Sequence, residues 1–239
     1  MPTDYTLYYW PIPFRGHFVR YLLVHCRQTW DEPPVAEMLA LKDQPAARQP
    51  VPFMAPPLLH HHAGDLWLSQ LPAILGYLGR QHGLFPGAPA ADALVHKIIG
   101  DASDVLEEIT CNCGRAMWTQ EGWNEFAAGR LPRWMAIFEE TGRRHGLSET
   151  AGHMLGSHAP SLADLATAAL WFTMTDKLPP LGPLLERSAP AVAALSRRIA
   201  SLPEIAAMRK SCDARWGDAY CGGQIEESLR KVVTVWAGE

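Results

Sequence analysis

Three adjacent histidines, His60, His61 and His62, are the most conspicuous group of potential metal ligands in the sequence. A structural zinc site needs four ligands that converge on one ion. Consecutive residues of an extended segment point to opposite faces, so these three imidazoles cannot all meet a single ion. No cysteine or carboxylate cluster beside them completes a tetrahedral site. We therefore expect residues 60–65 to form a solvated turn, and we expect no metal site.

The sequence also lacks the motifs of several other chemistries. No Gly-x-Ser-x-Gly pattern marks a serine nucleophile, and Gly64, Gly222 and Gly223 form no phosphate-binding loop. The cysteines are odd in number, with no Cys-x-x-Cys pair and without the density of a disulfide scaffold. We expect them to be the reduced thiols of an intracellular protein. They are Cys26, Cys111, Cys113, Cys212 and Cys221.

The first part of the chain alternates between short β-forming segments and helical patterns. Pro11 and Pro13 separate an aromatic strand from an apolar-periodic helix, and Gly83 ends the unit. We predict strands over residues 6–10, 34–40, 53–59 and 66–68, and helices over residues 15–26 and 70–81. The order is β-α-β-(α)-β-β-α, with an ambiguous segment over residues 43–49.

A linker and a helical domain follow. Residues 83–91 contain the clustered glycines and prolines of a linker. Beyond them, apolar residues recur every three or four positions, which is the spacing of one helical face. We predict helices from residue 92 onward and over residues 130–145, 161–177, 190–201 and 203–216. The predicted fold is an α/β domain over residues 1–82 and an all-helical domain over residues 92–239.

Ser161 and Asp164 predict the start of one of these helices. Serine is a favoured N-cap residue, and an acidic residue three positions later approximates a capping box, although aspartate is shorter than the usual glutamate or glutamine. The Ala/Leu-rich run that follows, up to about Lys177, is typical of a buried helix.

Composition excludes two classes of partner. The formal net charge of −4 provides no basic field for nucleic acid. No apolar run reaches the about 18–20 residues that cross a bilayer, and the N-terminus lacks the basic and apolar regions of a signal peptide. We therefore expect a soluble cytoplasmic protein that binds neither nucleic acid nor membranes.

The segment from Pro56 to the helix at Gln70 resembles part of a known family. A double proline precedes a strand, a turn and a second short strand, and these lead into a helix that opens with Gln70-Leu71. This order resembles the end of the thioredoxin-like domain of glutathione S-transferases, which is followed by an all-helical domain. The resemblance implies a homodimer that binds glutathione, with Pro57 in the cis conformation.

The first strand resembles that of the tyrosine-type members of this family. In the gapless register from Tyr9 to Arg20, Tyr9 takes the place of the catalytic tyrosine, Trp10 that of the aromatic residue after it, and Arg15 that of a basic residue beside the thiol. A phenol that donates to sulfur, near a cation and a helix N-terminus, lowers the pKa of a thiol. Tyr8 is a rival for this role.

The resemblance assigns the glutathione-binding residues as well, and two of them depart from the family pattern. The positions are Trp10, Pro56, Pro57, Ser69, Gln70, Leu71 and Asp101. Pro56 has no N–H to offer to the cysteinyl unit of glutathione. Leu71 stands where the family has the serine or threonine that binds the γ-glutamyl carboxylate. Ser69 or the free amides of the helix N-terminus would compensate.

The helical domain is expected to contribute the rest of the site. Asp101 and Asp104 resemble the position from which some classes reach across the dimer, and Cys113, Met117 and Trp118 lie where the family forms its second-substrate pocket. The resemblance implies a detoxifying transferase that conjugates glutathione to a small hydrophobic electrophile. Two alternatives are a non-catalytic binding protein of the same fold and a glutathione-dependent isomerase or peroxidase.

Overall fold

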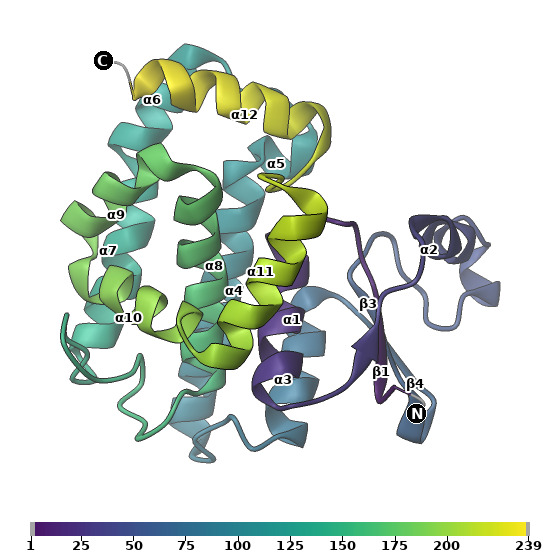
Figure 1. The fold of residues 1–239 in the computed structure, drawn as a ribbon. Helices are drawn as coiled ribbons and strands as arrows, with labels where there is room; N and C mark the ends of the chain where they lie inside the picture. Colours follow the sequence, from purple (N-terminus) through teal and green to yellow (C-terminus); the bar gives the residue numbers. More distant parts are fainter. Residues whose placement is uncertain (1–2, 238–239) are drawn as a thin grey trace.

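The computed structural model of the chain describes residues 3–237 and shows a small sheet beside a larger bundle of helices (Figure 1). The sheet comes from the N-terminal part of the chain, and the bundle comes from the remainder. The predicted order of an α/β unit followed by helices is confirmed.

The sheet has four strands in the order β2-β1-β3-β4. β1 runs parallel to β2 and antiparallel to β3, and β3 runs antiparallel to β4. The register pairs Tyr8 with Leu58 and Leu58 with Ser69, so the end of β1, the start of β3 and the end of β4 lie side by side. The strands are β1 (Tyr5–Tyr8), β2 (Trp30–Asp31), β3 (Leu58–His61) and β4 (Leu66–Ser69).

The three histidines occupy both faces of the sheet. On the face toward α3 (Leu71–Gln81), His61 stacks on the Tyr5 ring at 4.5 Å and forms a hydrogen bond with the Tyr77 hydroxyl. His60 stacks on Trp67 at 4.0 Å and lies next to His62 on the other face. β3 thus extends through His61, whereas the sequence predicted a turn from residue 60. No group of three or more possible ligands within residues 3–237 is arranged to hold a metal.

Residues 35–42 form a helix, whereas the sequence pattern predicted a strand over residues 34–40. Helix α2 (Val35–Lys42) begins after Pro34 and consists largely of alanine, glutamate, methionine, leucine and lysine. These are strong helix formers, and Met38 is the residue that α2 buries. Local helix propensity therefore outweighed the weak strand pattern, and the parallel strand of the sheet is the earlier β2.

β3 begins later than predicted. The sequence pattern placed a strand over residues 53–59, but regular pairing starts at Leu58. Pro56 and Pro57 lack the N–H groups that a ladder requires, so the chain before Leu58 cannot continue the sheet.

The helical bundle includes the helices predicted from periodicity together with several that were not predicted. α4 begins within the predicted linker, and α5, α6, α9 and α12 are additions. None of the helices within residues 3–237 is long and apolar enough to cross a membrane. The N-terminal unit also contains α1 (Phe14–His25), and the bundle contains α4 (Pro89–Ile109), α5 (Cys111–Gly114), α6 (Gln120–Ala128), α7 (Arg130–Arg143), α8 (Leu162–Lys177), α9 (Gly182–Ser188), α10 (Pro190–Ala200), α11 (Pro203–Trp216) and α12 (Gly223–Trp236).

Helix α8 connects the two parts of the molecule. It contacts α1 of the N-terminal unit as well as α4 and α10 of the bundle. Its start is the predicted capping box, because the fully buried Asp164 carboxylate accepts hydrogen bonds from the backbone N–H and the hydroxyl of Ser161. The same carboxylate accepts from the N–H of Met154 at 2.7 Å. One buried carboxylate therefore fixes both the helix start and the preceding loop.

Candidate functional site

Three segments singled out by the sequence resemblance meet at one end of the sheet. Tyr9 follows β1, Pro57 precedes β3, and Gln70 follows β4. The Pro56-Pro57 peptide bond is cis, as predicted. The register of the antiparallel strands therefore brings together a tyrosine, a cis-proline turn and the N-terminus of α3.

Tyr9 is buried beside the start of α1. Its side chain is 6% exposed, and its hydroxyl oxygen accepts a hydrogen bond from the backbone N–H of Arg15 at 3.1 Å. Gly16 permits this approach, since its Cα faces the tyrosine ring without a side chain. Within residues 3–237 the hydroxyl accepts this hydrogen bond and donates none, so its proton remains available to another acceptor.

Burial keeps the Tyr9 hydroxyl protonated. It raises the pKa of Tyr9 to about 12, and the charges of Arg15 and Arg20 lower the pKa only in part. A phenol in this state is a neutral hydrogen-bond donor at neutral pH. A donor of this kind, beside an arginine and the first turn of a helix, favours the thiolate form of a sulfur placed against it.

Arg20 holds the connection between β1 and α1 in place. Its fully buried guanidinium forms a two-pronged ion pair with Glu32, with distances of 2.8 Å from Nε to Oε1 and 2.6 Å from Nη2 to Oε2. It also donates to the carbonyl oxygens of Ile12 at 2.8 Å and Trp10 at 3.4 Å. The backbone of Trp10, a predicted site residue, is therefore fixed from α1.

Arg15 links the tyrosine to the helical bundle. Its guanidinium carbon lies 4.9 Å from the centroid of the Phe14 ring, and its Nη2 lies 3.7 Å from Sγ of Cys113 in α5. Cys113 is exposed and lies in a turn where the backbone has positive φ values. The structure thus brings together Tyr9, Arg15 and Cys113, which the sequence assigned to the catalytic centre and the second-substrate pocket.

The segment at the start of α3 combines a polar edge with an apolar anchor. Ser69 is half-buried, whereas Gln70 is exposed and has a positive φ of 71°. The Leu71 side chain is 4% exposed and belongs to the hydrophobic core. The side chain of Leu71 therefore has a packing role, and the polar groups here are the side chains of Ser69 and Gln70 and the first amides of α3.

Met117 and Trp118 follow α5. Met117 is exposed, whereas Trp118 packs against the rings of Trp123 and Phe126 at 5.3 and 5.2 Å. The indole N–H of Trp118 donates to the carbonyl oxygen of Ile109 at 2.9 Å. Trp118 therefore connects the end of α4 to α6.

Asp101 forms an ion pair with Lys97, one turn earlier on α4. Burial together with the neighbouring carboxylates of Asp101, Glu107 and Glu108 raises the pKa of Asp104. The two candidate aspartates thus belong to an acidic surface of α4.

Sequence reasoning missed the segment between α11 and α12. Tyr220 is buried there and packs edge-on against Phe14, next to the tyrosine site. The missed signal was the Gly222-Gly223 pair followed by Glu226, because a glycine pair before an acidic first turn is typical of a helix start.

Comparison with known proteins identifies the family. Residues 94–232 match the family model described as "Glutathione S-transferase, C-terminal domain". The chain belongs to the glutathione S-transferase family. Two curated relatives are glutathione S-transferase P of Bos taurus, 29% identical over 136 residues, and that of Capra hircus, 29% identical over 139 residues. These matches cover 56% and 57% of this chain but only 61% and 62% of the relatives.

Comparison with solved structures confirms the fold. A Pi-class glutathione S-transferase of Onchocerca volvulus is 19% identical with a TM-score of 0.72, and the match covers 92% of this chain and 98% of that one. A chain described as prostaglandin synthase D of Nilaparvata lugens is 19% identical with a TM-score of 0.69, with coverage of 87% and 98%. The chain therefore has a thioredoxin-like unit followed by an all-helical part.

Proposed function

We propose that this member of the glutathione S-transferase family is a glutathione transferase. It activates the thiol of glutathione through Tyr9 and joins the glutathione sulfur to a small hydrophobic electrophile. The observation that carries the proposal is the Tyr9 hydroxyl, which accepts the Arg15 N–H and keeps its own proton for a substrate sulfur. The proposed activation of the thiol needs no metal, since the Tyr9 hydroxyl and the start of α1 stabilise the thiolate.

The remaining residues have defined roles in this proposal. Arg15 contributes its charge, and Trp10 and the cis Pro56-Pro57 turn flank the bound tripeptide. Ser69, Gln70 and the first amides of α3, including that of Leu71, bind the γ-glutamyl end, since free N–H groups at a helix N-terminus favour an anion. Cys113, Met117 and Trp118 border the second substrate.

A second candidate is a binding protein of the same fold that does not catalyse conjugation. Two observations favour it: Pro56 has no N–H for the cysteinyl unit, and the Leu71 side chain is buried in the core. Each removes one hydrogen bond that the family pattern supplies to glutathione.

Two measurements on the same preparation separate these candidates. Calorimetric titration with glutathione should show one saturable site per chain, and mixing with 1-chloro-2,4-dinitrobenzene should give the conjugate faster than the uncatalysed reaction. Conjugation would contradict the second candidate, and binding without conjugation would favour it. The absence of both binding heat and conjugation would contradict the transferase and would indicate a binding protein for another ligand.

The proposed assembly is a cytoplasmic homodimer in which α4 packs against its symmetry mate and the partner's N-terminal unit. The family resemblance supports this proposal, because it places Asp101 and Asp104 where some classes reach the ammonium group of glutathione bound across the interface. Isologous contact is the usual geometry of such dimers.

A further inference from the structure

The connection between α11 and α12 lies against the turn that follows Tyr9. Figure 1 shows it meeting the connection between β1 and α1. Tyr220 is 1% exposed, and its ring centroid lies 5.4 Å from that of Phe14. A Cβ on Gly222 would lie 3.6 Å from Cδ1 of Ile12. Residues 219–222, which we call the wall segment, therefore lie against the residues on both sides of Pro13.

One carboxylate holds the backbone of the wall segment. Oε2 of Glu226 accepts hydrogen bonds from the N–H groups of Tyr220, Cys221 and Gly222 at 2.9, 2.9 and 2.6 Å. Glu226 is itself buried. Hydrogen bonds to a charged acceptor are about twice as strong as those between neutral groups. The conformation of this segment thus depends on a side chain.

Glu226 is held in turn by Arg230. Its Oε1 accepts from Nε of Arg230 at 2.7 Å, and Nη1 of the arginine donates to the carbonyl oxygen of Lys177 at 3.1 Å. Arg230 also donates to the carbonyl oxygen of Asp218. Burial alone would raise the pKa of Glu226, but the N–H groups and Arg230 outweigh it and lower the pKa below 4.5.

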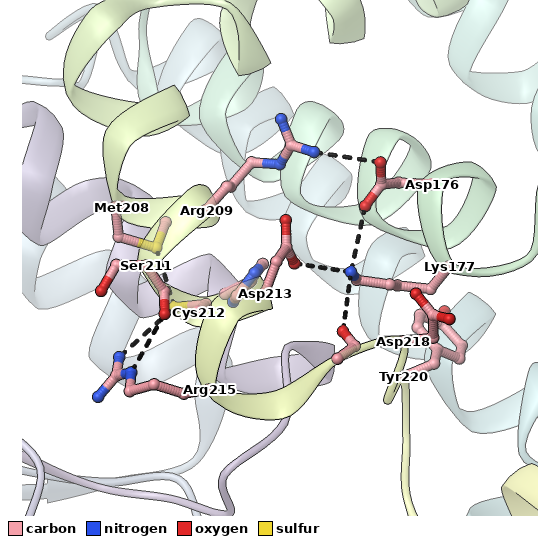
Figure 2. Close-up of polar contacts among 12 residues, drawn as sticks. Asp176, Lys177, Met208, Arg209, Ser211, Cys212, Asp213, Arg215, Asp218 and Tyr220 are labelled. Carbon is pink, nitrogen blue, oxygen red and sulfur yellow. Dashed lines mark hydrogen bonds and ion pairs between the residues drawn. The ribbon is translucent and has the colours of Figure 1, made fainter.

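Lys177 anchors the other end of the connection. Figure 2 shows its ammonium group between the carboxylates of Asp176 and Asp213, with the Asp213 Oδ1 at 2.7 Å. The same ammonium donates to the carbonyl oxygen of Gly217 at 3.3 Å. The connection is therefore fixed to α8 at its start and to α12 at its end.

We propose that Glu226 is a positioning residue for the candidate site, and that it holds the wall segment over Tyr9 to form one border of the second-substrate pocket. The argument is geometric: Phe14 and Ile12 flank the turn that leads to Tyr9 and Arg15, and the wall segment packs on both. The claim that the wall segment borders the electrophile rests on the proposed function. The claim that Glu226 fixes the conformation of the wall segment does not.

The first test measures the wall segment without any catalytic assay. Cys221 is partly buried, and loss of the Glu226 charge should expose its thiol to N-ethylmaleimide in the folded protein. In Glu226→Gln, we expect labelling of Cys221, followed by peptide mass spectrometry, to be at least about tenfold faster. Glu227→Gln is the matched control, since Glu227 is exposed on the same turn, and it should label at the wild-type rate.

Buried Cys212 reports whether the whole chain has loosened instead. Its labelling should stay slow in Glu226→Gln, and an equal rise at Cys212 and Cys221 would overturn the proposal. Arg230→Met is an independent change, because it keeps the Glu226 carboxylate but removes its charged partner and the bonds to the carbonyl oxygens of Lys177 and Asp218. It should also raise the labelling rate of Cys221. An unchanged rate in both variants would also overturn the proposal.

The second test is a kinetic one. Glu226→Gln should raise the KM for 1-chloro-2,4-dinitrobenzene by about three- to tenfold and leave the KM for glutathione within about twofold, because the wall segment borders the electrophile. An equal change in both constants would overturn this part of the proposal. A wild-type protein without conjugating activity would contradict the proposed function, and the labelling results would still decide the role of Glu226.

Discussion

A Cβ atom on Gly16 would lie 2.5 Å from Cδ1 of the Tyr9 ring and 2.5 Å from Nη1 of Arg20. Alanine gains about 1 kcal/mol over glycine in a helix interior, but overpacking a core costs about 1–3 kcal/mol. Because this neighbour is a buried ring, the clash should outweigh the gain. We expect Gly16→Ala to lower stability in urea denaturation and to slow conjugation by displacing Tyr9.

Gly76 provides the control for this change. It lies in the middle of α3, and the nearest heavy atom that a Cβ there would meet is Cε1 of His96 at 3.5 Å, an ordinary van der Waals distance. Gly76→Ala should therefore raise stability by up to about 1 kcal/mol. If both alanine variants changed stability in the same direction, close packing would not explain the requirement for glycine at position 16.

Tyr9→Phe should retain the ring packing and most of the affinity for glutathione, while the pKa of the bound thiol rises toward its free value of about 8.5. A charge-assisted hydrogen bond is worth about 1.5–3 kcal/mol, so conjugation at neutral pH should fall by roughly one to two orders of magnitude. The pH dependence of the conjugation rate measures the shift.

Tyr8→Phe is the matched control for Tyr9. Tyr8 stacks on Trp67 at 5.6 Å, and neighbouring strand residues face opposite sides of a sheet. We expect a wild-type pH profile from this variant. A larger loss in Tyr8→Phe than in Tyr9→Phe would show that the hydroxyl has been assigned to the wrong residue.

Arg20→Met should be among the most destabilising single changes in this chain. It leaves Glu32 as a largely buried carboxylate without its ion-pair partner, which typically costs about 3–5 kcal/mol. It also frees the carbonyl oxygens of Trp10 and Ile12. Urea denaturation of Arg20→Met and of Arg20→Met/Glu32→Leu checks this, since the double variant should recover part of the loss.

The loss in Arg20→Met should depend on pH. Burial alone would raise the pKa of Glu32, but Arg20 and the Trp30 indole hold it below 4.5. A lowered pKa contributes stability that is present above 4.5 and is lost as pH falls through the folded value. The difference in unfolding free energy between wild type and Arg20→Met should therefore shrink below pH 4.5. A constant difference would contradict the ion-pair account.

Asp164→Ala should destabilise the start of α8 more than Ser161→Ala does. Replacing a capping serine costs about 1 kcal/mol, whereas loss of the Asp164 carboxylate leaves buried N–H groups of Met154 and Ser161 unsatisfied at about 1–3 kcal/mol each. Thermal unfolding of the two variants and of Asp164→Asn measures the order. Unchanged melting of Asp164→Ala would refute the capping role.

The proposed homodimer predicts a solution mass of twice the 26.4 kDa chain at micromolar concentration, measured by light scattering. Asp101→Asn and Asp104→Asn should then weaken glutathione binding in the dimer. A mass of 26.4 kDa would remove any role for these residues across an interface.

Local sequence was sufficient to predict several elements of the fold. The capping pair Ser161 and Asp164 and the periodic helices of the bundle appear in the structure, and each depends on residues close in sequence. The cis Pro56-Pro57 bond also appears, but it was implied by the family resemblance. The exceptions include α2, where helix propensity outweighed a weak strand pattern. They also include the later start of β3 and the helices α5, α6, α9 and α12, which were not predicted.

The surroundings of Tyr9 were decided by tertiary structure. Gly16 permits the close approach of the Tyr9 ring, and a wall segment about two hundred residues later packs on the neighbouring Phe14. The register of β1 with β3 and β4 brings the cis-proline turn and Gln70 beside Tyr9. The same holds for the Arg20–Glu32 ion pair and for the three backbone N–H groups that donate to Glu226. The sequence shows the types of these residues, but it does not show that they contact one another. Such contacts form because folding removes these groups from water, and each buried charge or N–H group must then find a partner that local sequence does not specify.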